Sequence, residues 1–203
     1  MNLNLILVKK INPFLFIIFL TPSLYWYIKL YLGKMGINPI ESIIHELGEF
    51  SLRLLILTLL ITPLSQIYFF RNLKILRRMI GLFAFFYIFL HFSSYIILDH
   101  FFNWEQILKD IYKRPFITLG FISFLLTIPL VATSNDAMVR KLTYKVWKMI
   151  HRLVYFIAPL AGLHYYLLTK ADKIKPLIYL SIILILIFLR VIIYFSKKDF
   201  SPR

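Results

Sequence analysis

Long, nearly uninterrupted blocks of apolar residues constrain this chain more than any other feature of its sequence. Its 203 residues are 60% apolar and 16% charged, whereas a soluble domain has about 45–50% apolar and about 25% charged residues. The apolar residues fall into blocks of about 20, the length of helix that crosses the roughly 30 Å hydrocarbon core of a bilayer. The sequence therefore predicts an all-α integral membrane protein.

Six such blocks can be drawn, and they predict a bundle of six transmembrane helices in a single domain, residues 1–203. The expected spans are about 11–31, 49–69, 79–99, 115–134, 149–169 and 176–195. The second span is the least apolar at its start, where Glu49 and Arg53 have the i, i+4 spacing at which opposite charges can pair. The first block contains Pro13 and Pro22 and no small-residue cleavage site follows it before Lys34, so we expect a span and not a cleaved signal.

The distribution of Lys and Arg among the loops predicts the orientation of these spans. Fifteen of the 24 basic residues fall on the side that holds both termini, eight fall on the other side, and Arg53 lies within a span. The side richer in Lys and Arg is expected to be cytoplasmic, which places both termini inside. The net charge of +15 is explained by these loops and by anionic lipid head groups, so we expect membrane lipid and no nucleic acid as a partner.

Two further absences restrict the chemistry. The chain has no cysteine, which excludes disulfides, thiolate haem ligation, iron–sulfur clusters and catalytic thiols. The loops between the expected spans are short, so no extramembrane domain is available to bind NADPH or a soluble substrate, and the Gly33–Gly36 segment lacks the strand–loop–helix setting of a nucleotide site. Chemistry is therefore expected within the bundle or at its surfaces.

Three histidines lie inside the apolar blocks. An imidazole in hydrocarbon costs free energy unless it hydrogen-bonds, carries protons or binds a metal. His91 and His164 belong to two spans of the same direction and lie near the same depth, given the helical rise of about 1.5 Å per residue. This placement predicts that they are the axial ligands of one haem iron in the outer half of the membrane. Small residues near them, Ala84, Ser94, Ala161 and Gly162, fit either a macrocycle or ordinary helix packing.

His151 begins the fifth span at the other face, about 20 Å along the helix from His164. No second histidine is expected at that level, so His151 is either a ligand that shares its metal with a different group or an interfacial side chain. His45 and His100 are expected to be ordinary interfacial histidines, and Arg190 is expected to reach toward the cytoplasmic head groups. No aromatic residue is assigned a role in electron relay.

Several short motifs resemble those of the MsrQ family, also called YedZ, within the wider ferric-reductase-like transmembrane group. The main one is the run 77–87, RRMIGLFAFFY, followed by Leu90 and His91. The others are NPIE at 38–41 leading to His45 and Gly48, TPL at 62–64, KRPFIT at 113–118, TS at 133–134 before RKL at 140–142, Trp147 followed by HRLVY at 151–155, and LHY at 163–165. The resemblance covers nearly the whole chain, with the first span and the tail matching least.

The resemblance implies a b-type haem on His91 and His164, with His151 also implicated. It implies a redox subunit in the bacterial inner membrane that delivers electrons to a periplasmic, molybdenum-containing methionine-sulfoxide reductase subunit, which itself repairs oxidised proteins. It further implies FMN as a cofactor, and the quinone pool or a cytoplasmic flavin reductase as electron donor. No residue of this sequence indicates an FMN site.

Two alternatives remain open from the sequence. The same fold could serve as a ferric reductase or as a stand-alone quinone-linked haem oxidoreductase. A small transporter or proton conductor that uses the buried histidines is a non-redox alternative, although the spans lack the intramembrane carboxylates that proton relays usually have.

Overall fold

The computed structural model describes residues 3–199, and for residues 3–11 and 197–199 it describes the backbone alone. Arg203, which the charge count places on the inner side, lies outside the described residues, as do the side chains of Lys9, Lys10, Lys197 and Lys198.

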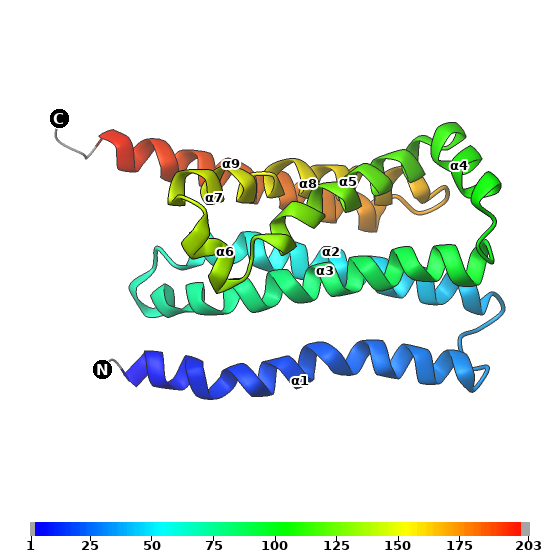
Figure 1. Cartoon of the computed structure of the whole chain (residues 1–203), viewed down its shortest axis with the longest axis horizontal. Coiled ribbons are helices and arrows are strands. Elements are labelled where there is room, and N and C mark those ends of the chain that lie inside the picture. Colours follow the sequence, from blue (N-terminus) through cyan, green and yellow to red (C-terminus); the bar gives the residue numbers. More distant parts are fainter. Residues whose placement is uncertain (1–2, 200–203) are drawn as a thin grey trace.

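The described chain is helical throughout, as the apolar blocks predict (Figure 1). The long elements are α1 (Leu3–Tyr31), α2 (Pro39–Leu64), α3 (Leu76–Ser94), α5 (Pro115–Ala132), α8 (Val154–Leu168) and α9 (Ile174–Asp199). The short ones are the 3₁₀ helix η1 (Tyr68–Ile75), the π-helical turn η2 (Tyr95–Asp99), α4 (Trp104–Lys113), α6 (Asp136–Lys141) and α7 (Tyr144–His151). Within the described residues, α1 begins and α9 ends at the same end of the bundle, which also carries α6 and α7; we call it the basic end.

Five segments of the described chain are long and apolar enough to cross a membrane. They are Asn12–Tyr31, Pro39–Leu64, Tyr68–Asp99, Pro115–Ala132 and Ile174–Ser196. The expected span 149–169 is not a continuous helix, because the chain turns at Arg152 and Leu153 between α7 and α8. The amide of Arg152 bonds to the carbonyls of Lys148 and Met149, a tightening typical of a helix end. With 15 residues, α8 alone is shorter than the roughly 20 that a bilayer requires.

The second helix begins ten residues before the expected span 49–69 and ends five residues before its end, at Leu64. Asn38 explains the early start, since its side chain accepts from the amide of Glu41 and Pro39 occupies the first helical position. The first turns of α2 contain Glu41, Glu46 and Glu49, so they do not form an apolar block and the sequence does not assign them to the span.

The helix α2 is the centre of the bundle and packs into two cores. One core joins α1, α2 and α3 around Ile43, Leu47 and Tyr87, all fully buried. The other joins α2, α5, α8 and α9 around Leu59 and Ile157. Figure 1 shows α2 and α3 between α1 on one side and α5, α8 and α9 on the other. The bundle therefore consists of two helical layers that share α2.

Tyr87 fixes α1 to this core by entering its backbone hydrogen-bond ladder. Its hydroxyl donates to the carbonyl of Phe19 at 2.7 Å and accepts from the amide of Ser23 at 3.0 Å. In a regular helix these two backbone groups would bond to each other. The adjacent Pro22 lacks an amide proton and already interrupts the helical hydrogen bonds here. The Tyr87 hydroxyl supplies the partners that the Ser23 amide and the Phe19 carbonyl would otherwise lack.

Arg190 is buried, with 6% of its surface exposed, so the expectation that it reaches the head groups is wrong. Its guanidinium donates to the carbonyl of Leu59 from Nη2 at 2.6 Å and from Nε at 3.2 Å. Leu59 lies four residues before Pro63, which has no amide proton to offer this carbonyl. Nη2 also reaches the carbonyl of Thr58 at 3.1 Å, and Nη1 the hydroxyl of Tyr155 at 3.3 Å. Arg190 of α9 therefore supplies the donor that the Leu59 carbonyl of α2 lacks because of Pro63.

We expect R190M to destabilise the fold by about 1–3 kcal/mol, because it leaves the Leu59 carbonyl buried without a donor. The midpoint of thermal unfolding in one detergent should fall, while R152M should change it little, since Arg152 is exposed. Equal midpoints for R190M and the unmodified protein would show that the Leu59 carbonyl needs no such partner.

Candidate functional site

The structure brings His91 of α3 and His164 of α8 face to edge across the two layers. Their ring centroids lie 6.2 Å apart and the ring planes cross at 79°. Both side chains are partly buried. The structure therefore brings the two imidazoles together, at one level of the bundle.

Each imidazole is anchored at Nδ1 by a backbone carbonyl of a neighbouring helix. The Nδ1 of His91 lies 2.8 Å from the carbonyl oxygen of Ile44 in α2, and the Nδ1 of His164 lies 2.6 Å from that of Phe116 in α5. A carbonyl can only accept, so Nδ1 carries the proton in both rings. The deprotonated Nε2 atoms are then available as ligands, and an Nδ1–carbonyl bond is the usual support of a histidine that binds a metal.

A glycine lies directly under each ring. A Cβ added to Gly48 would lie 2.9 Å from both Cε1 and Nδ1 of His91, and a Cβ added to Gly120 would lie 2.8 Å from Nδ1 of His164. Both distances are shorter than real Cβ contacts. Only glycine allows each imidazole to approach the facing helix this closely.

The two halves of this site repeat one local arrangement, which we call the glycine–carbonyl–histidine module. Gly48 follows the accepting carbonyl of Ile44 by four residues, and Gly120 follows that of Phe116 by four residues. The first module joins α2 to α3 and the second joins α5 to α8. No repeat is visible in the sequence, so this duplication is a finding of the structure.

The donor set fits a haem with two axial histidines. A histidine nitrogen binds a metal at about 2 Å, so two imidazoles could hold one metal only where their rings lie a few ångströms apart. The observed separation is 6.2 Å. When bound, such a haem would supply one-electron chemistry at its iron, and the two modules would supply the neutral imidazoles that hold it.

Below this pair, toward the basic end, lies a cavity of about 920 Å³. It begins near Ala84, Ile88 and Ile157, one to two helical turns from the histidine pair. His151 lines it, with its ring stacked on Trp147 at a centroid distance of 4.1 Å. The cavity is also lined by five basic side chains, Lys74, Arg77, Arg78, Lys148 and Arg190. Their charges suit an anionic group such as a carboxylate or a phosphate.

His151 is held less firmly than the other two histidines. Its Nδ1 lies 3.1 Å from the carbonyl of Trp147 and its Nε2 lies 3.4 Å from the hydroxyl of Ser134. The residue at the same level of α3, thirteen positions before His91, is Arg78. The structure therefore does not bring His151 together with another histidine.

The other two histidines make no hydrogen bond to the pair, although His45 is near enough to act electrostatically on both rings. His45 is exposed on α2. His100 follows η2, and its Nε2 lies 3.4 Å from Asp110 and 3.6 Å from Asp99.

The small residues named from the sequence have different uses. Ala84 is buried and lines the cavity. Ser94 bonds through its hydroxyl to Tyr27 of α1 at 3.0 Å. A Cβ on Gly162 would meet Leu180 of α9 at 2.9 Å, so Gly162 serves helix packing. The residues that accommodate the imidazoles, Gly48 and Gly120, lie on the facing helices, where spacing from a histidine gives no signal.

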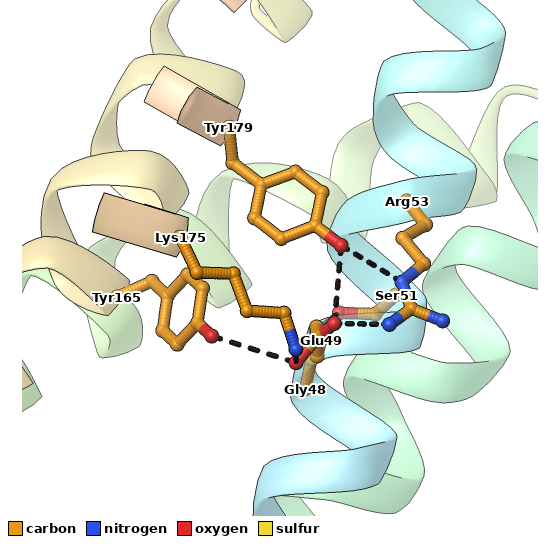
Figure 2. Close-up of polar contacts among 7 residues, drawn as sticks. All are labelled: Gly48, Glu49, Ser51, Arg53, Tyr165, Lys175 and Tyr179. Carbon is orange, nitrogen blue, oxygen red and sulfur yellow. Dashed lines mark hydrogen bonds and ion pairs between the residues drawn. The ribbon is translucent and has the colours of Figure 1, made fainter. Parts of the chain in front are cut away.

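A group of charged and phenolic side chains gathers around Glu49, the residue after Gly48, and we call it the Glu49 cluster (Figure 2). The Glu49 carboxylate pairs with Arg53, as the i, i+4 spacing predicts. It also accepts from Lys175 at 2.6 Å, from the hydroxyl of Tyr179 at 3.0 Å and from that of Tyr165 at 3.4 Å. Sequence spacing finds only Arg53, because the other three partners come from α8 and α9.

Known proteins resemble this chain over most of its length. Residues 47–162 match the family model described as ferric reductase like transmembrane component. The chain is 49% identical over 161 residues to a protein of Caulobacter vibrioides, covering 79% of this chain and 77% of that protein. It is 46% identical to a protein of Herminiimonas arsenicoxydans, with 82% and 77% covered, and 44% identical to one of Rhodospirillum rubrum, with 87% and 85% covered. All three relatives are named protein-methionine-sulfoxide reductase heme-binding subunit MsrQ.

Proposed function

This chain belongs to the MsrQ family of haem-binding membrane subunits within the ferric reductase like transmembrane group, and from that premise we propose that it is an electron-transfer subunit of a methionine-sulfoxide reductase system. The observation that carries the proposal is the pair of facing modules, which present two imidazoles with anchored Nδ1 atoms 6.2 Å apart. His91 and His164 are the proposed axial ligands of a b-type haem.

Each half of the site has a definite task in this proposal. The carbonyls of Ile44 and Phe116 keep the imidazoles neutral and directed at the iron. The surrounding helices exclude water, which favours transfer of an electron over reactions with solvent. The chain passes electrons and leaves the reduction of methionine sulfoxide to a catalytic partner.

The finer assignments follow the family. We propose a multi-pass protein of the bacterial inner membrane, residues 1–203 forming one unit with six spans and both termini in the cytoplasm. The proposed acceptor is a periplasmic, molybdenum-containing methionine-sulfoxide reductase subunit that supports repair of oxidised periplasmic proteins. The proposed donor is the quinone pool or a cytoplasmic flavin reductase, with FMN as a further cofactor. The start of α1 and the end of α9 at the same end of the bundle support the even number of spans.

An absorption spectrum tests the central claim. The protein purified from a haem-replete membrane should show a Soret band and, after dithionite, the sharp α and β bands of a six-coordinate b-type haem. A colourless protein, or a spectrum unchanged by dithionite, would rule the proposal out. Because the family model is named for ferric reductases, reduction of ferric chelates is the second activity to measure. A protein that transfers electrons only to the catalytic partner, and does not reduce ferric chelates, would exclude the ferric reductase function.

His151 is proposed to bind a second redox group in the basic cavity. We expect H151A to lower the haem-to-protein ratio while leaving the dithionite-reduced bands of the His91–His164 haem in place, because His151 belongs to α7 and lines the basic cavity, whereas His164 lies near the far end of α8. Pyridine haemochrome measurements on both proteins give the ratio. An unchanged ratio would remove His151 from the set of ligands.

A further inference from the structure

The Glu49 cluster has the features of a functional site and not of an ordinary surface ion pair. Its central carboxylate has only 14% of its side-chain surface exposed and lies in a helix long and apolar enough to span a membrane. Ionised groups at such positions are costly and mark function by default. The carboxylate gathers donors from three helices, α2, α8 and α9, as Figure 2 shows.

The cluster is tied to both halves of the histidine pair through adjacent residues. Gly48, which lies under the His91 ring, immediately precedes Glu49. Tyr165, which donates to Glu49, immediately follows His164. One dipeptide of α2 thus supports His91 with its glycine and holds the segment that carries His164 with its glutamate.

The charges of the cluster do not cancel. Glu49 contributes one negative charge, and Arg53 and Lys175 contribute two positive charges within contact of it. Coulomb interactions act over longer distances inside a membrane bundle than in water, because the dielectric constant is low. Because Glu49 follows the glycine beside His91 and its partner Tyr165 follows His164, a group held by the two rings would lie near the charge of Glu49.

We propose that Glu49 and Lys175 set the reduction potential of the haem bound by His91 and His164, with Glu49 also positioning the helix that carries His164. The inference rests on the proposed haem function. Reduction removes one positive charge from the iron site, so a nearby carboxylate favours the ferric form and a nearby ammonium favours the ferrous form. The two residues thus act on the potential with opposite signs.

Redox titration of the purified haem protein tests this. E49Q should raise the midpoint potential of the haem and K175Q should lower it. The double variant E49Q/K175Q, which removes one charge of each sign, should return the potential toward that of the unmodified protein. The matched controls are E46Q, one helical turn away, and K170Q, both at exposed positions, which should leave the potential where it was.

A purely structural cluster gives a different pattern. Loss of packing would shift the potentials of both single variants in one direction, or lower haem content without moving the potential, and either result would overturn the proposal. If E49Q does not fold, K175Q still decides the question, because the Lys175 side chain is 53% exposed; an unchanged or raised potential in K175Q would refute the assignment. A wild-type protein without haem would instead refute the proposed function itself.

Discussion

We expect replacement of His91 or His164 with alanine to abolish the b-type spectrum of the reduced protein. In the proposed site each imidazole would supply one bond to the haem iron, and a backbone carbonyl holds each ring in place. Removing either leaves a ligand position that the surrounding apolar residues cannot fill. The expected loss of haem is nearly complete in both variants, measured as the haem-to-protein ratio after purification.

The control for this experiment is H45A, which removes an exposed imidazole outside the pair. It should retain the spectrum. Full retention of haem in both H91A and H164A would show that neither ring is an axial ligand, and the site would have to be sought elsewhere in the bundle.

Alanine at Gly48 or Gly120 has the second-largest expected effect, a several-fold loss of haem. The new methyl group would lie 2.9 Å from Cε1 and Nδ1 of His91, or 2.8 Å from Nδ1 of His164. The ring cannot yield without giving up its bond to Ile44 or Phe116. Haem content should fall, and the electron paramagnetic resonance spectrum of the haem that remains should change with the altered orientation of the imidazole.

A loss of haem in G48A or G120A could not be explained by weaker helices. Alanine is a better helix former than glycine by about 1 kcal/mol, so the substitutions strengthen α2 and α5 as helices. The matched control is G81A, whose new Cβ would lie at an ordinary 3.8 Å from Cγ2 of Thr58; because Gly81 lines the basic cavity and not the pair, G81A should leave the resonance spectrum of the His91–His164 haem unchanged. Unchanged haem content and resonance spectra in G48A and G120A would show that the close approach is not needed.

The sequence predicts the helical class and most of the long helices because apolar blocks of bilayer length have few other solutions. The start of α2 could not be predicted from apolar blocks. The helix begins at the Asn38 cap and Pro39, and its first turns carry three glutamates. The turn at Arg152 and Leu153 was missed because apolar residues continue on its far side. Composition predicts the apolar stretch, but it does not predict the backbone hydrogen bonds of Arg152 that divide this stretch into two helices.

The histidine pair could be predicted from depth alone, while its supports could not. Gly48 and Gly120 are meaningful only beside rings from other helices, and the carbonyls that anchor those rings are not visible in any sequence pattern. Arg190 shows the same limit, because its burial is explained by the carbonyl that Pro63 leaves free on a helix more than 100 residues earlier.

The duplicated module also bears on how the protein is assembled. All parts of the first module lie between residues 44 and 91, and all parts of the second lie between 116 and 164. During synthesis the first half can therefore be complete, with its imidazole already oriented, before the second half has left the ribosome. A haem bound by both imidazoles would act as a cross-link between an early and a late half of the chain, so its capture would mark the moment at which the two halves become one folding unit.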